Sequence, residues 1–168
     1  MRNASKHQAG LSIIEFTLVS TVLLMIIFGV FEVGRYMYSL QLINEATRIA
    51  ARLGVVCRVK ERDNIPALVV PTPLAGGFSS SNLSIDYLDQ NGAVVDIDVS
   101  SDDAEKDTYS KIYYVRARVT NFVYQFSGVL SFLGEGVSIP NYETVRPREN
   151  LGYLRADGDD TTSDYTEC

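Results

Sequence analysis

Apolar residues are concentrated in one block near the N-terminus, and the rest of the chain alternates between apolar and polar positions. In the block, residues 11–31 (LSIIEFTLVSTVLLMIIFGVF), Glu15 is the only charged residue. A helix of this length is about 32 Å long, close to the hydrocarbon thickness of a bilayer. The remaining chain offers too little apolar material to surround it. The block therefore predicts a membrane-spanning helix.

The helical pattern continues beyond the apolar block as an amphipathic stripe. Neither proline nor glycine interrupts residues 35–53. Apolar residues recur there at helical spacing on one face, at Leu42, Ile43, Ala46, Ile49, Ala50 and Leu53. Gly54 is a typical C-terminal stop. We therefore expect one helix from Leu11 to Leu53 whose second half packs one face on a folded domain.

Shorter elements follow from residue 63 onwards. Asn91-Gly92 between two apolar runs indicates a β-hairpin, and Pro140 favours an edge position for the last strand. We expect a short helix or buried turn at 63–71, strands at 83–88, 93–99, 111–124 (central) and 136–147, and a solvated loop at 101–107. Strands after a long helix predict an α+β fold, pilin-like in outline, with a small antiparallel sheet packed on the amphipathic half of the helix.

Charges at the two ends of the apolar block indicate its orientation. The preceding residues carry Arg2 and Lys6 and no acid, so the positive-inside rule predicts a cytoplasmic N-terminus and an exported C-terminal domain. At the far end, Glu32 and Arg35 have the spacing of a helical ion pair. A cleaved secretory signal peptide is the alternative, but its apolar region is shorter and ends at a small-residue site that we do not find here. We expect the segment to stay attached.

Glu15 is anomalous because an ionisable side chain inside a bilayer is costly and usually functional. No cation stands at helical spacing within the block. Cleavage of the Gly10–Leu11 bond would create an ammonium group on Leu11, four residues before Glu15, in the same helix or in a parallel neighbour. The alternative is an uncut anchor in which Glu15 reaches back to the membrane interface.

These features together resemble a type IV prepilin and, more narrowly, the TadE-like family of the tight-adherence (Tad/Flp) pilus system. The basic leader ending in Gly10 precedes Glu15-Phe16, and the segment FGVFEVGR (residues 28–35) matches a pattern F-G-x-x-E-x-G-R. NEATRIAARLG (residues 44–54) is similar to the helix that follows in the family. The resemblance is strong over residues 8–54, loose to about residue 152, and does not include the acidic tail.

The resemblance implies a minor pilin or pseudopilin cut after Gly10 by an aspartate-type prepilin peptidase. Its partners would be other pilins and minor pilins, the peptidase and an inner-membrane assembly platform, and Glu15 and Phe16 would serve assembly and register. An uncleaved, membrane-anchored periplasmic binding module is the alternative. The implied divisions are a leader (1–10), a transmembrane and assembly helix (11–34), an amphipathic continuation (35–56), an exported α+β domain (57–152) and an acidic tail (153–168).

Composition argues against other classes of function. The net charge is −6, and two sparse arginine pairs do not make a nucleic-acid surface. His7, the only histidine, lies in the leader, so we expect neither catalysis nor a cofactor or metal site. A calcium-loop likeness at 87–98 is better explained by the hairpin, and the tail acids by a disordered tail. In an exported domain Cys57 and Cys168 are candidates for a disulfide, with two free thiols as the alternative.

Overall fold

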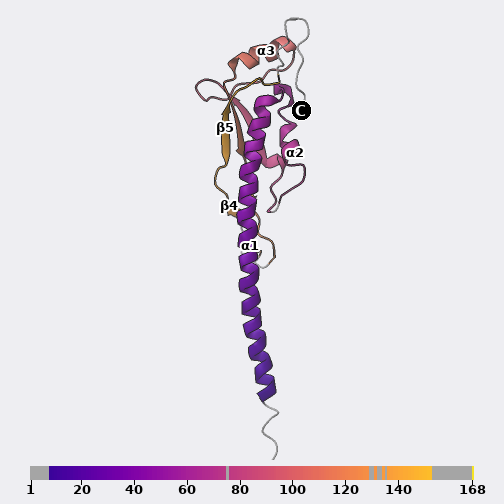
Figure 1. Ribbon diagram of the computed structural model, residues 1–168, viewed down its shortest axis with the longest axis vertical. Coiled ribbons are helices and arrows are strands. Elements are labelled where there is room, and N and C mark those ends of the chain that lie inside the picture. Colours follow the sequence, from indigo (N-terminus) through magenta and orange to yellow (C-terminus); the bar gives the residue numbers. More distant parts are fainter. Residues whose placement is uncertain (1–7, 75, 129–130, 132–133, 135, 153–167) are drawn as a thin grey trace, which may run out of the picture.

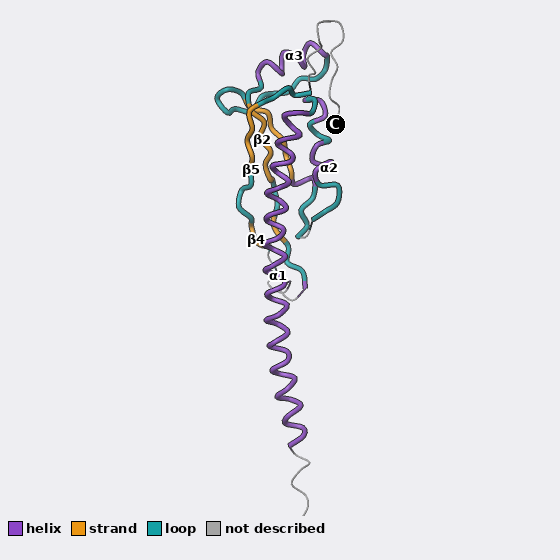
Figure 2. Tube along the Cα trace, viewed as in Figure 1, coloured by secondary structure: helices purple, strands orange, loops and turns teal. Residues whose placement is uncertain are grey.

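The fold consists of one long helix with a small domain built around its second half. The computed structural model describes residues 8–74, 76–128, 131, 134, 136–152 and 168. Helix α1 (Gln8–Val56) forms a stalk, and the strands and short helices gather at one end of it (Figure 1). The first half of α1 extends alone from this domain (Figure 2). The predicted α+β fold is confirmed.

The domain contains a three-stranded antiparallel sheet and a separate two-stranded ribbon. The sheet has the order β1 (Leu83–Leu88), β2 (Tyr114–Val119), β5 (Glu143–Pro147), so β2 is central, as predicted. The ribbon pairs β3 (Val123–Tyr124) with β4 (Val137–Ser138). The short helices are η1 (Val59–Glu61), α2 (Ile65–Val69), η2 (Ser80–Asn82) and α3 (Asp102–Lys111).

One face of the sheet packs against the outer half of α1. Val115 and Ala117 of β2 are fully buried and alternate with the half-exposed Arg116, as expected of a strand with one covered face. On the helix, small residues dominate the buried face, which comprises Ile43, Ala46, Thr47, Ala50, Ala51, Gly54 and Val55. Small side chains let the helix approach the sheet closely.

Two details of the predicted helix are wrong, and one close contact explains the first. Gly54 does not end α1, which continues to Val56. A Cβ atom at Gly54 would lie 2.8 Å from Val115 Cγ1 and 3.4 Å from Ile85 Cγ2, so glycine is present because the sheet lies against the helix there. Ile49 is 42% exposed and lies outside the buried face, which is rotated toward Thr47 and Ala51.

The strand predicted at 83–88 is confirmed as β1, whereas the predicted central strand at 111–124 is too long, because only Tyr114–Val119 form β2 and Val123–Tyr124 belong to the separate ribbon. The turn at Asn91-Gly92 forms, but beyond it only Val94 makes a bridge, to Leu88. The predicted last strand is divided into β4 and β5, and β5 lies at an edge as expected. The predicted loop at 101–107 is instead the start of α3, because the side chain of Ser101 caps that helix by accepting the N–H of Ala104.

Candidate assembly site on the N-terminal helix

The first half of α1 is an apolar rod that none of the described residues covers. From Leu11 to Phe31 its large apolar side chains are exposed, with Phe16 at 72%. Among the described residues, α1 is the one helix that is long and apolar enough to cross a membrane. Such a rod is stable only in lipid or against other apolar helices. It is therefore compatible with a single-pass membrane anchor.

Glu15 lies exposed on this rod. None of the described residues forms an ion pair or hydrogen bond with its carboxylate. Thr17 is not its partner, because the Thr17 hydroxyl donates to the carbonyl oxygen of Ile13 in the preceding turn. The Gly10–Leu11 bond lies within the first turns of α1. Any partner of the Glu15 carboxylate therefore lies outside the described residues.

The predicted contact between Glu32 and Arg35 is present and has a third member. Arg35 Nη1 lies 3.4 Å from Glu32 Oε2. The backbone N–H of Ser127 donates to Glu32 Oε1 at 2.8 Å, and Arg35 also donates to the Ser127 hydroxyl. Glu32 is only 6% exposed as a result. No sequence pattern predicts the contact with Ser127, which is 95 residues away from Glu32 along the chain.

An aromatic cluster joins the β3–β4 ribbon to α1 one turn further on. Tyr36 packs edge-on against Tyr124, with ring centroids 5.0 Å apart, and Phe126 lies 5.4 Å from Tyr124. Gly76 lies so close that a Cβ atom there would overlap the Tyr124 ring. The Tyr124 hydroxyl is buried, and no residue within the described ranges forms a hydrogen bond with it. Aromatic packing rather than hydrogen bonding therefore holds Tyr124 against the helix.

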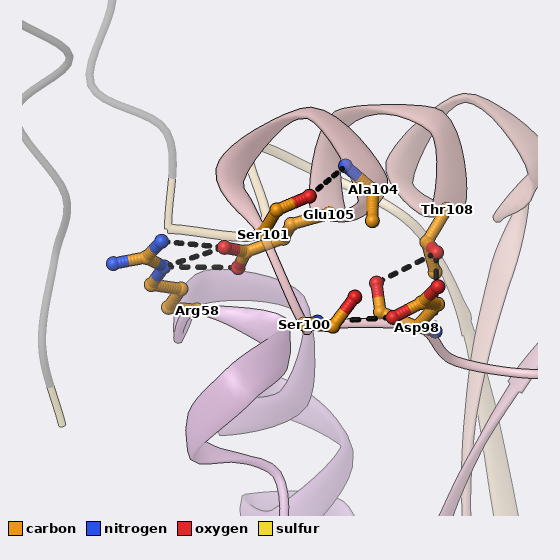
Figure 3. A network of polar contacts seen from close by, with 7 residues as sticks. All are labelled: Arg58, Asp98, Ser100, Ser101, Ala104, Glu105 and Thr108. Atoms are coloured by element: carbon orange, nitrogen blue, oxygen red, sulfur yellow. Dashed lines mark hydrogen bonds and ion pairs between the residues drawn. The ribbon is translucent and has the colours of Figure 1, made fainter.

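The far end of α1 is fastened by a disulfide and a buried ion pair. Cys57 follows α1 directly and is bonded to Cys168, with Cα atoms 5.7 Å apart. Arg58 Nε lies 2.9 Å and 3.0 Å from the two carboxylate oxygens of Glu105, a fully buried residue of α3. Figure 3 shows this pair beside the Ser101 cap. The disulfide was one of two alternatives from sequence, and the Arg58–Glu105 pair was not foreseen.

A hollow of about 550 Å³ between α2 and β1 could receive a ligand, but its charged groups are already paired. Arg62 lies 3.0 Å from Asp63, and Asp86 lies within 3 Å of both Arg116 and Arg118. The other lining residues are small or apolar, namely Pro66, Ala67, Ser80, Ser81, Leu83, Ser84 and Ile85. The hollow thus gives no specific support to a binding module.

Comparison with known proteins identifies a family that the N-terminal helix resembles. A family model described as TadE-like protein matches residues 10–52. The chain carries a TadE-like segment. No curated protein and no solved structure matches the chain. The predicted resemblance is confirmed for this part of the chain.

The TadE-like segment contains the Gly10–Leu11 bond, Glu15 and the contact of Glu32 with Arg35. It ends before Cys57, so the match covers nearly all of α1 and none of the sheet. The TadE-like family is a structural family of the Tad pilus rather than a family of enzymes, and it suggests a pilus-associated, pilin-like protein that interacts with other pilus components.

Proposed function

We propose that this chain is a minor pilin or pseudopilin that supports assembly of a Tad/Flp pilus and, through it, surface adhesion and biofilm formation. The observation that carries the proposal is an apolar helix inside the TadE-like segment that no described part of the chain covers, and whose Glu15 has no partner among the residues that the structure describes. Before assembly the helix would cross the inner membrane with its N-terminus in the cytoplasm and its domain in the periplasm. Afterwards it would pack against the helices of other pilins.

Cleavage after Gly10 would give Glu15 a partner. In the hydrolysis, water adds across the Gly10–Leu11 amide, which leaves a carboxylate on Gly10 and an ammonium group on Leu11. Residues four apart lie on the same helix face, so the new cation could pair with Glu15 of its own chain or of a parallel neighbour. Pairing would offset up to about 3 kcal/mol of the cost of a carboxylate in the bilayer. Loss of Arg2 and Lys6 with the leader would change the net charge from −6 to −8.

Two glycines in α1 support close packing with other helices. A Cβ atom at Gly29 or Gly34 would meet nothing within 4 Å, so contacts within the chain do not require glycine at either position. Gly54, in contrast, is required by the sheet. Small residues on apolar helices allow neighbouring backbones to approach closely. Gly29 and Gly34 would serve this purpose against another pilin.

Mass spectrometry of the membrane-extracted protein tests the processing step. We expect the chain to begin at Leu11 in cells that contain the prepilin peptidase and at Met1 in cells that lack it. A chain that still begins at Met1 when the peptidase is present and active on another prepilin would refute the proposal. That result would leave the uncleaved, membrane-anchored binding module as the better interpretation.

A second test separates assembly from processing. Glu15→Gln keeps the side chain's size and removes its charge, so we expect normal cleavage and a several-fold loss of sheared surface pili. Glu45→Gln is the matched control, because Glu45 is an exposed glutamate on the outer half of the same helix. Equal piliation of the two variants would contradict the role given to the Glu15 charge.

A further inference from the structure

The apolar block sets the depth of the domain relative to the bilayer, once α1 is taken as a membrane anchor under the proposed function. Residues 11–31 span about 32 Å, which fills a hydrocarbon core of about 30 Å. Glu32 is then the first residue outside it. Arg35 and Tyr36 follow at about 6 Å and 7.5 Å beyond Phe31 along the helix axis. The headgroup layer on each side is about 5–8 Å thick, so these three residues lie within it or at its outer limit.

Contacts with these residues hold part of the domain at the same depth. Ser127 donates its backbone N–H to Glu32 at 2.8 Å, and Tyr124 packs on Tyr36. Tyr124 belongs to β3, which pairs with β4. In Figure 1, β4 accordingly lies beside α1 and nearer its apolar half than β5 does. The β3–β4 ribbon is thus placed in or beside the headgroup layer.

The exposed surface at this depth suits a membrane interface. Val123 of β3 is 45% exposed and Val137 of β4 is 39% exposed. On the helix, Met37 and Tyr38 are also exposed at this level. Apolar and tyrosine side chains are both favoured where hydrocarbon meets headgroups. In water the exposure of these apolar side chains would be unfavourable.

The charges at this depth suit anionic phospholipid in the same way. Glu32 would be repelled by phosphate, but Ser127 and Arg35 cover it. The Arg35 side chain is 47% exposed and presents its cation to the surroundings instead. At the level of the lipid phosphates, the Glu32 carboxylate is therefore buried and the Arg35 guanidinium is exposed.

We propose that the β3–β4 ribbon and Ser127 are a membrane contact of the exported domain, resting in the phospholipid headgroup layer while the protein is anchored. The domain would then stand against the bilayer at this ribbon, while the three-stranded sheet is held further out. Gly54 is about 35 Å beyond Phe31 along α1, and the sheet packs on the helix there.

Tryptophan quenching tests this placement directly, because the chain contains no tryptophan. Single substitutions Val137→Trp and Val123→Trp would report on the ribbon. Val94→Trp is the matched control, an exposed valine bridged to Leu88 at the far end of the sheet. Ile27→Trp reports on the membrane span. Each full-length variant would be reconstituted in phosphatidylethanolamine–phosphatidylglycerol vesicles, with lipid spin-labelled at the headgroup or brominated in the acyl chains.

We expect the headgroup label to quench both ribbon tryptophans several-fold more strongly than the tryptophan at residue 94. Brominated chains should quench the tryptophan at residue 27. If that residue is quenched while both ribbon tryptophans behave like the control, the membrane contact is refuted and the anchor stands. If residue 27 is not quenched, the membrane anchor itself is refuted, and the proposed contact with it. Far-UV circular dichroism would check that each variant is folded.

Discussion

Gly54 offers a direct test of how α1 and the sheet fit together. In an isolated helix, replacing glycine by alanine stabilises by about 0.8–1 kcal/mol, because alanine loses less conformational freedom on folding. In this chain the added Cβ atom would lie 2.8 Å from Val115 Cγ1, well inside an ordinary van der Waals distance. Both methyl groups are attached to packed elements, so one of the elements must shift. Helix propensity and packing therefore make opposite predictions for Gly54→Ala.

Packing should dominate. Adding a methyl group to a well-packed core typically costs about 1–3 kcal/mol, so after the propensity gain we expect Gly54→Ala to lower the free energy of unfolding by up to about 2 kcal/mol. In a Val115→Ala background the obstructing atom is absent. The same substitution should then stabilise by about 1 kcal/mol, which is the propensity term alone. The effect of Gly54→Ala should thus change sign between the two backgrounds.

Urea titration of the detergent-solubilised full chain would measure these free energies. The chain has ten tyrosines and no tryptophan, so tyrosine emission reports on the domain. The four chains form a double-mutant cycle whose coupling energy isolates the contact between residues 54 and 115. If Gly54→Ala stabilises both backgrounds equally, the helix does not lie against β2 as described.

Three further perturbations test other parts of the domain. Cys168→Ser should lower the free energy of unfolding by about 4–5 kcal/mol in the chain-entropy model for a separation of 111 residues, and a reductant should have no further effect on that variant. Glu105→Ala should lower the free energy of unfolding by about 3 kcal/mol in urea titration, because it removes the carboxylate partner of the largely buried Arg58 side chain, whereas Asp107→Ala at an exposed pair should cost under about 1 kcal/mol. Burial raises the pKa of the Tyr87 hydroxyl, so with rising pH the unfolded state loses this proton before the folded state does. The Tyr87 hydroxyl should therefore not change the free energy of unfolding below about pH 10 and should lower it above that pH. In thermal unfolding at alkaline pH, Tyr87→Phe should reduce the dependence of stability on pH.

Local patterns made the helix and the sheet centre predictable. The apolar block and the amphipathic stripe identify α1, and the β-branched run identifies β2 as a central strand. Long-range contacts decided the rest. From sequence, Gly54 indicates the end of the helix, and only the structure shows that Val115 packs against it. The acidic run of α3 indicates a solvated loop by composition. The helix cap at Ser101 is the local signal that predicts a helix there.

The candidate site divides in the same way. Glu32 and Arg35 are three residues apart on one helix, so their contact follows from helical spacing. Ser127 reaches them only because the ribbon packs back on α1, and no local pattern indicates that. Glu15 was conspicuous from composition alone because a single charge stands in an apolar block. Its partner stays a prediction, since none of the described residues supplies one.

Helix α1 is synthesised before the strands that cover it, so the nascent chain exposes an apolar surface. Helix α1 leaves the ribosome first, yet β5, which completes the sheet beneath it, ends at Pro147. About 90 residues must follow the helix, which takes roughly 5–20 s at ordinary rates of bacterial and eukaryotic translation. Throughout that interval the apolar face around Ile43 and Ala50 has no native cover. Nascent chains should therefore be most vulnerable to aggregation and proteolysis late in synthesis, and a holding chaperone would act on α1 rather than on the strands.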